Sequence, residues 1–416
     1  MKKVIIVLAS FLAGIFVTGC SKGVYDLGRD GDISDYKDGS SYAVADGEGP
    51  MEGIGGEGNG SSGNTSSGIV TAGEWRDLDH WLFWSGLMTT QGEDGFSEMP
   101  SYWGFYVNQL VAVKYVQEER PVIGAKVELS RNGKVVWTAK TDNKGFAYTW
   151  VSPFQELNEV SPDELTVIIE GSEMAGHPEL TSWTSQTEVK INQYQKMTAD
   201  AQPMISNKTD IAFIVDATGS MDDEIRFLKD DLVDILGKAT EKANGISVLR
   251  TAAVFYRDEG DQYVTRYDDF KTNVASTVEF IKEQNADGGG DYPEAVHTAL
   301  EASLQKLSWG EDSRMRVAFL LLDAPAHHNQ AVIASLQQSI ETYARLGIRI
   351  IPIAASGADK NTEFMLRFFA NLTGGTYTFL TNDSGVGGDH IVASVGEYEV
   401  EQLNELIVRL IAGYLD

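Results

Sequence analysis

Cysteine and positive charge are both scarce in this sequence. Its 416 residues include one cysteine, Cys20, and 33 Lys and Arg against 61 Asp and Glu, so the formal net charge is −28. A single cysteine excludes a disulfide within the chain. The acidic balance argues against nucleic acid as a partner, because the phosphate backbone would be repelled, and it favours the binding of cations.

Three catalytic signatures and any internal repeat are also absent. The sequence has no His-Glu-x-x-His zinc-protease helix, no Gly-x-Ser-x-Gly nucleophile elbow and no Walker loop. We therefore expect a protein that is not an enzyme. Hydrolysis assisted by a bound metal is the less favoured alternative.

The first twenty residues have the pattern of a targeting segment. Two lysines precede an apolar run, 4–17, which is shorter than the roughly 20 residues of a membrane-spanning helix. Small residues then lead to Cys20. This resembles a bacterial lipoprotein signal, which implies that residues 1–19 are removed and that lipidated Cys20 anchors the protein to the membrane. Ser21 follows, and by the same resemblance it favours the outer membrane. An ordinary secretory signal is the alternative.

Residues 20–73 predict a tether, because this segment is acidic, rich in Gly and Ser, and poor in large apolar residues. A dense aromatic segment, 74–84, follows it. Its side chains could offer a platform to a carbohydrate or a partner. We expect instead that they cover the core of the next domain.

Short alternating strands are predicted in residues 74–200, which indicates an Ig-like β-sandwich. Asn132-Gly133 predicts a hairpin, because both residues tolerate positive φ. The run 121–145 resembles carboxypeptidase-regulatory-like and Cna-B-like domains, which implies a spacer or stalk. The expected strands are 105–116, 122–129, 134–140, 146–151, 164–170 and 186–191.

From residue 205 to 416 strand and helix patterns alternate, which predicts a doubly wound α/β domain with a mainly parallel sheet. The expected strands are 211–216, 248–256, 317–323, 348–354 and 376–379. The expected helices are 222–242, 274–284, 293–307, 331–346, 363–372 and 398–414.

The segment 210–221 carries the strongest functional signal. An apolar strand ends at Asp216, the hydroxyls of Thr218 and Ser220 follow at alternate positions, and a helix then begins. Hard oxygen donors suit Mg²⁺, Mn²⁺ or Ca²⁺. The pattern resembles the metal-ion-dependent adhesion site (MIDAS) of von Willebrand factor type A (VWA) domains, which implies a Rossmann-like fold and a cation completed by a partner's carboxylate. Thr218 or Ser220 could alternatively cap the helix.

A second apolar strand ends at Asp323, and the VWA resemblance implies that this carboxylate belongs to the same metal site. His327 and His328 follow. Without a neighbouring Cys or a spaced pair of histidines, we expect them to be surface or loop residues rather than ligands.

The loop 287–294 departs from the common VWA pattern, which has a Thr here. It resembles the Gly-Gly-Asp-x-Pro-Glu loop of a bacterial and α-kinase-associated branch. Asp291 could replace the Thr as a ligand. It could instead be the N-cap of the next helix, with Glu294 closing a capping box. Arg257 and Glu294 are predicted at the rim, where Arg257 could pair with Asp291 and offset the charge.

Together these features predict a lipid-anchored envelope protein that mediates cation-dependent adhesion or scaffolding. The metal ligands would be Asp216, Thr218, Ser220, Asp291 and Asp323. The partners would be a protein carboxylate at the metal and the membrane through Cys20. The alternative is a structural spacer in which the metal only stabilises the fold.

Overall fold

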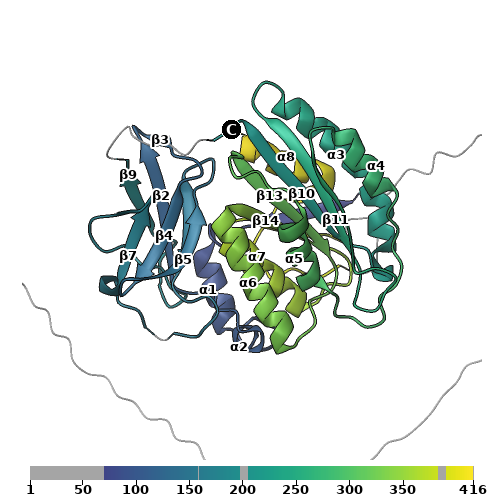
Figure 1. Ribbon diagram of the computed structural model, residues 1–416. Coiled ribbons are helices and arrows are strands. Elements are labelled where there is room, and N and C mark those ends of the chain that lie inside the picture. Colours follow the sequence, from purple (N-terminus) through teal and green to yellow (C-terminus); the bar gives the residue numbers. More distant parts are fainter. Residues whose placement is uncertain (1–69, 158, 197–204, 383–389, 416) are drawn as a thin grey trace, which may run out of the picture. The chain divides into compact units, whose positions relative to one another are not determined.

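The computed structural model describes residues 70–157, 159–196, 205–382 and 390–415 (Figure 1). The predicted signal peptide, the lipidation site Cys20 and most of the tether lie outside these residues. Within the described ranges, no helix has the length and apolarity needed to cross a bilayer.

An eight-stranded sheet forms the centre of the C-terminal region. Strands β11, β10, β13, β14 and β15 run parallel, while β12, β1 and β16 pair antiparallel to their neighbours. In sheet order the strands are β12 (Thr265–Lys271), β11 (Val248–Tyr256), β10 (Lys208–Asp216), β13 (Met315–Leu322), β14 (Ile348–Ala354), β15 (Tyr377–Leu380), β1 (Thr71–Trp75) and β16 (Glu401–Gln402). Every residue of β13 and β14 is buried, as expected for parallel strands covered on both faces.

Helices cover both faces of this sheet (Figure 1). Alternate residues of β10 divide between two cores: Phe213 packs with α3 and α8, and Ile214 packs with α5, α6 and α7. The helices are α3 (Asp222–Ala243), α4 (Val274–Lys282), α5 (Val296–Lys306), α6 (Gln330–Leu346), α7 (Lys360–Thr373) and α8 (Leu403–Leu415). The predicted α/β architecture is thus confirmed, although α8 begins five residues later than 398.

Two four-stranded sheets lie between β1 and β10 in the chain. One contains β3 (Arg120–Pro121), β2 (Leu110–Gln117), β6 (Phe146–Trp150) and β9 (Ile191–Gln195); the other contains β5 (Lys134–Lys140), β4 (Lys126–Arg131), β7 (Leu165–Ile169) and β8 (Ser172–Glu173). The hairpin between β4 and β5 is confirmed, with φ of 51° at Asn132 and 78° at Gly133. The last strand, β9, starts where the predicted strand 186–191 was expected to end.

Three tryptophans that follow β1 in the chain lie in the interior. Trp81 and Trp84 lie on α1 (Trp81–Thr89), Trp103 ends α2 (Met99–Trp103), and all three side chains are buried. The Trp84 ring stacks on Phe364 of α7 at a centroid distance of 6.2 Å. Trp81 and Trp84 therefore cover a core, as expected. That core also contains residues of α7 in the α/β domain.

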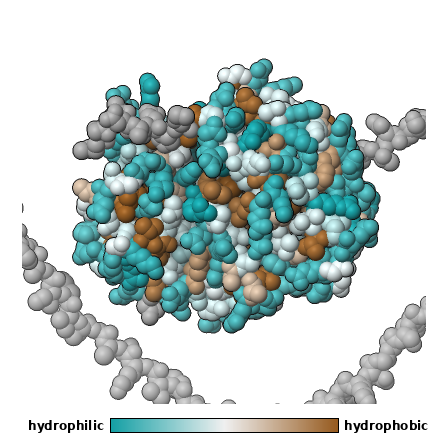
Figure 2. All heavy atoms as spheres, in the orientation of Figure 1, coloured by the Kyte–Doolittle hydropathy of each residue, from teal (hydrophilic) through white to brown (hydrophobic). Residues whose placement is uncertain are grey.

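The molecular surface is otherwise mostly hydrophilic, with small separate apolar areas on the face shown in Figure 2. The exposed large apolar side chains come from many different elements. This agrees with the large excess of acidic residues.

Candidate functional site

Asp216 ends β10 and its side chain is fully buried. Thr218 donates two hydrogen bonds to Oδ1 of Asp216, from its backbone N–H at 2.9 Å and from its hydroxyl at 2.7 Å. The Ser220 hydroxyl lies 3.4 Å from the Thr218 hydroxyl. Thr218 precedes the short 3-10 helix η3 (Gly219–Met221), but its side chain makes no capping hydrogen bond there. Its hydroxyl contacts the carboxylate instead.

Asp323 follows β13, the strand next to β10, and its side chain is also buried. The carboxyl ends of these parallel strands therefore bring Asp216 and Asp323 to the same edge of the sheet. Backbone hydrogen bonds join the three loops at this edge: Asp287 N–H to Ala217 O at 3.0 Å, Gly219 N–H to Gly288 O at 3.2 Å, and Glu294 N–H to Pro325 O at 2.9 Å.

Burial first, and then the charges of neighbouring carboxylates, raise the pKa values of the acidic groups at this edge. Burial, and then the charge of Asp323, raises the pKa of Asp216 to about 7. Burial also raises the pKa of Asp323, against an opposing contribution from the Ser220 hydroxyl. For Glu294, burial followed by the charge of Asp216 raises the pKa to about 9. These directions follow when acidic groups are buried together without a cation.

The donor atoms at this edge fit a divalent cation. Asp216 Oδ2, Asp323 Oδ1 and Glu294 Oε2 are buried without a hydrogen-bond partner. Such atoms are costly to leave unpaired, and hard oxygens are the ligands that Mg²⁺, Mn²⁺ and Ca²⁺ prefer. Across the described ranges, no three Asp, Glu, His or Cys side chains are already gathered as a metal cluster. The Thr218 hydroxyl, with the Ser220 hydroxyl 3.4 Å from it, adds further oxygen donors beside Asp216.

Of the two alternatives for Asp291, the capping box is wrong. Helix α5 begins at Val296, its N-cap residue is Ala295, and no side chain caps it. Residue Glu294 instead pairs with Ala326 in a parallel bridge, so the backbone is still extended where the helix was expected. The Asp291 side chain is exposed, whereas that of Glu294 is 3% exposed. In this loop Glu294 thus points inward and Asp291 outward. The ligand set proposed below therefore leaves out Asp291, which the sequence had offered as a ligand, and keeps Asp216, Thr218, Ser220 and Asp323.

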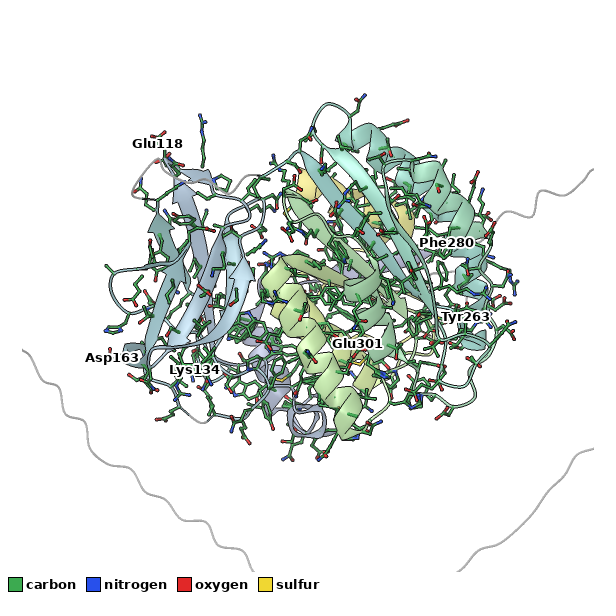
Figure 3. All side chains as sticks on the ribbon, viewed as in Figure 1. Glu118, Lys134, Asp163, Tyr263, Phe280 and Glu301 are labelled. Carbon is green, nitrogen blue, oxygen red and sulfur yellow. The ribbon has the colours of Figure 1, made fainter. Side chains whose placement is uncertain are left out.

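The predicted pairing of Arg257 with Asp291 is also wrong. Arg257 pairs with Asp287 at 3.4 Å and donates to the Asn285 carbonyl at 2.8 Å. Its guanidinium lies 4.5 Å from the ring centre of Tyr263, which Figure 3 labels. These contacts tie Arg257 to Asp287, the first residue of the Gly-rich loop 287–294. The backbone N–H of Asp287 in turn donates to the Ala217 carbonyl, next to Asp216.

The two histidines after Asp323 have different surroundings. His327 Nε2 lies 2.7 Å from Asp258 Oδ1 and is about a quarter exposed. The ring of His328 stacks on Tyr102 at 3.8 Å. Both have partners within the protein, in keeping with the expectation that they are loop residues.

Glu224 is a further acidic residue near the site that the sequence interpretation missed. It lies in the first turn of α3, it is buried, and Ser356 after β14 donates a hydrogen bond to it. Its charge contributes to the raised pKa of Asp323. Helical periodicity could have found it, because Glu224 is in phase with the buried Leu228 and Leu232.

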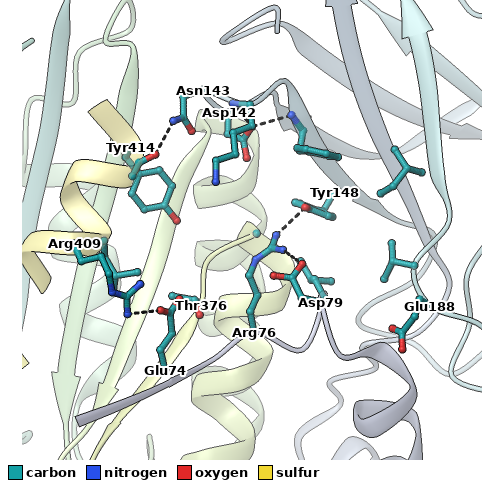
Figure 4. Close-up of a pocket in the computed structure, with 18 residues that line it drawn as sticks. Glu74, Arg76, Asp79, Asp142, Asn143, Tyr148, Glu188, Thr376, Arg409 and Tyr414 are labelled. Carbon is teal, nitrogen blue, oxygen red and sulfur yellow. Dashed lines mark hydrogen bonds and ion pairs between the residues drawn. The ribbon is translucent and has the colours of Figure 1, made fainter. Parts of the chain in front are cut away.

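A cavity of about 720 Å³ lies elsewhere, lined by residues of β1, β6, β9, α8 and the loops beside them (Figure 4). Several of its charged lining residues pair with each other or with neighbours. Arg76 donates to the Tyr148 hydroxyl at 2.7 Å, and Arg409 pairs with Glu74 at 2.8 Å. Because Arg76 and Arg409 already have partners, they are less available to bind a ligand than the unpaired oxygens at the Asp216 edge.

Residues 210–364 match the von Willebrand factor A domain family, so the α/β region contains a VWA domain. VWA domains are in general protein-binding or adhesion domains. The match begins in β10 and ends in α7, and it includes all three loops at the Asp216 edge.

Two curated relatives each match about a third of the chain. The alpha-protein kinase vwkA of Dictyostelium discoideum is 34% identical over 125 residues, which are 29% of this chain and 19% of that protein. An ariadne-like RING finger protein of Acanthamoeba polyphaga mimivirus is 29% identical over 133 residues, 32% of this chain and 13% of that protein. The chain thus spans less than a fifth of either relative.

Solved structures show weaker likeness. Proximal thread matrix protein 1 from the mussel byssus is 17% identical, with a TM-score of 0.31 and coverage of 40% of each chain. The pilus adhesin SpaC from Lactobacillus rhamnosus GG is 11% identical, with a TM-score of 0.33 over 50% of this chain and 30% of that one. At these scores neither structure carries a functional argument.

Proposed function

We propose that this protein is a lipid-anchored envelope protein whose VWA domain binds a protein partner in a divalent-cation-dependent manner. The observation that carries the proposal is the pair of buried carboxylates, Asp216 and Asp323, each with an unpartnered oxygen at the carboxyl end of neighbouring strands. Asp216, Thr218, Ser220 and Asp323 would hold the cation. A bound cation supplies an electrophilic centre that a partner's carboxylate can coordinate.

The proposal assigns binding rather than catalysis to this site. The buried groups are acceptors and hydroxyls, and the nearby His327 is paired with Asp258. In the proposed arrangement Cys20 carries the lipid, the protein lies at the outer membrane, and the two four-stranded sheets of the predicted domain 74–200 form an Ig-like sandwich that acts as a spacer.

The first test is isothermal titration of Mg²⁺, Mn²⁺ and Ca²⁺ into the full chain, beside Asp216→Ala and the exposed-loop control Asp291→Asn. Saturable binding that is lost in Asp216→Ala and kept in Asp291→Asn supports the site. A folded wild type that binds none of the three cations would refute it.

A structural spacer is the second candidate, and the same buried acidic groups favour it. A cation that offset their charge would stabilise the fold without any partner. The two candidates separate in pull-downs from envelope extracts with and without EDTA. A partner captured by wild type and released by EDTA, but not captured by Asp216→Ala, supports the binding function. Metal-dependent melting without such a partner supports the spacer.

A further inference from the structure

Glu294 is held next to the proposed cation site by its backbone. Its N–H donates to the Pro325 carbonyl at 2.9 Å, and it forms a bridge with Ala326, three residues after Asp323. The loop 287–294 and the loop after Asp323 are therefore tied together at Glu294. Its position does not depend on exposed side chains.

The side chain of Glu294 is directed into the protein beside Thr218. A Cβ atom built on Gly289 would lie 3.2 Å from Glu294 Oε1 and 3.4 Å from the Cβ of Thr218. Gly289 also has φ of +72°, a conformation that favours glycine. A glycine at this position thus allows the carboxylate and Thr218 to approach each other.

No basic side chain of the protein neutralises Glu294 among the residues that the structure covers. Arg257 pairs with Asp287, and His327 pairs with Asp258. Glu294 Oε2 is buried and makes no hydrogen bond. A buried carboxylate with a free oxygen, beside Thr218 and tied to the loop that follows Asp323, is suited to face a cation or a water bound to it.

From this arrangement we propose that Glu294 is an internal competitor for the partner's carboxylate at the cation site. The inference rests on the proposed function, since it requires a cation at Asp216. With Glu294 in place, a partner's carboxylate that approaches the cation is repelled by Glu294, in addition to Asp216 and Asp323. The Glu294 side chain would also occupy the position that this carboxylate needs, so the partner binds weakly. A partner gains access only by displacing Glu294, which makes the site selective for ligands that can do so.

The test uses Mn²⁺ as the ion and acetate as the carboxylate probe, with the full chain. Water proton relaxation reports the water molecules on bound Mn²⁺, and acetate that replaces a water lowers the signal. The variants are Glu294→Gln, which keeps the shape and removes the charge, and Asp291→Asn as the matched control in the same loop. We expect acetate to bind Mn²⁺-loaded Glu294→Gln about tenfold more tightly than wild type, and Asp291→Asn to behave as wild type.

Equal acetate affinity in wild type and Glu294→Gln, with Mn²⁺ bound in both, would overturn the role of Glu294 and leave the proposed function standing. Absence of Mn²⁺ binding in folded wild type would overturn both. If Glu294→Gln fails to fold by circular dichroism, Glu294→Asp takes its place. The shorter side chain withdraws the carboxylate, so acetate affinity should again rise, and an unchanged affinity would count against the inference.

Discussion

Arg367 of α7 and Asp77, which follows β1, form an ion pair in which both side chains are almost completely buried. Arg367 Nε donates to Asp77 Oδ2 at 3.0 Å across 290 positions of sequence. Asn371 donates to the same oxygen, Glu363 pairs with the guanidinium at 3.1 Å, and the guanidinium lies 5.0 Å from the ring centre of Trp84. This network joins the segment before the β-region to the VWA domain.

The Asp77→Ala variant should be strongly destabilised. It leaves the buried Arg367 with Glu363 as its only carboxylate partner, and breaking a buried pair costs about 3–5 kcal/mol. Urea unfolding measures the free energy. The control is Asp79→Ala, whose side chain is 61% exposed and pairs with Arg76, so its loss should stay below about 1 kcal/mol. Equal losses in the two variants would contradict this account.

The VWA domain should not be stable when it is cut at the limits expected from the sequence. A fragment of residues 205–416 lacks β1, the partner of β15, and also lacks Asp77. We expect it to melt at a much lower temperature than a fragment of residues 70–416, or to be unfolded. Thermal circular dichroism of both fragments and the full chain decides the point. A cooperative transition at the same temperature in all three would show that β1 is dispensable.

The stability of the metal-free protein should fall as the pH rises from about 4 to 7. Native Asp216 holds its proton up to a pKa of about 7, because burial and Asp323 oppose its charge, whereas the unfolded chain loses that proton near pH 4. The native state therefore binds more protons in this window, and stability is lost on going up in pH. Urea unfolding in EDTA at pH 5 and pH 8 measures the difference.

Asp216→Asn should lose less stability over the same interval, since its amide does not titrate, while the exposed Asp291→Asn keeps the wild-type slope. Saturating Mg²⁺ should oppose the loss in wild type only. If the free energy of unfolding falls equally steeply with pH in Asp216→Asn and in wild type, the group that titrates is not Asp216.

Gly289→Ala should weaken both the fold and Mn²⁺ binding. The left-handed backbone alone costs about 1–2 kcal/mol for a residue with a Cβ, and the new atom would also crowd Glu294 and Thr218. Gly133→Ala is the matched control, because Gly133 has φ of +78° but nothing within 4 Å of a Cβ. Both should be destabilised in urea, and only Gly289→Ala should bind Mn²⁺ more weakly. Unchanged Mn²⁺ affinity would separate Gly289 from the site.

The sequence by itself determined the parallel α/β sheet, the hairpin at Asn132-Gly133 and the strand ends that carry Asp216 and Asp323. Each of these follows from a local pattern: a continuous apolar run for a strand buried on both faces, a dipeptide that accepts positive φ, and a polar residue where the run ends. Local patterns suffice here because the carboxyl ends of parallel strands necessarily share one edge.

Only the tertiary structure decided which acidic residue of the Gly-rich loop turns inward and which partners the buried charges take. By spacing, Asp291 and Glu294 fitted a capping box, but the bridge from Glu294 to Ala326 holds the backbone extended and delays the helix to Val296. Likewise, nothing near Asp77 in the sequence indicates Arg367. Pairings across hundreds of residues depend on how the finished sheet and helices pack, which local spacing does not encode.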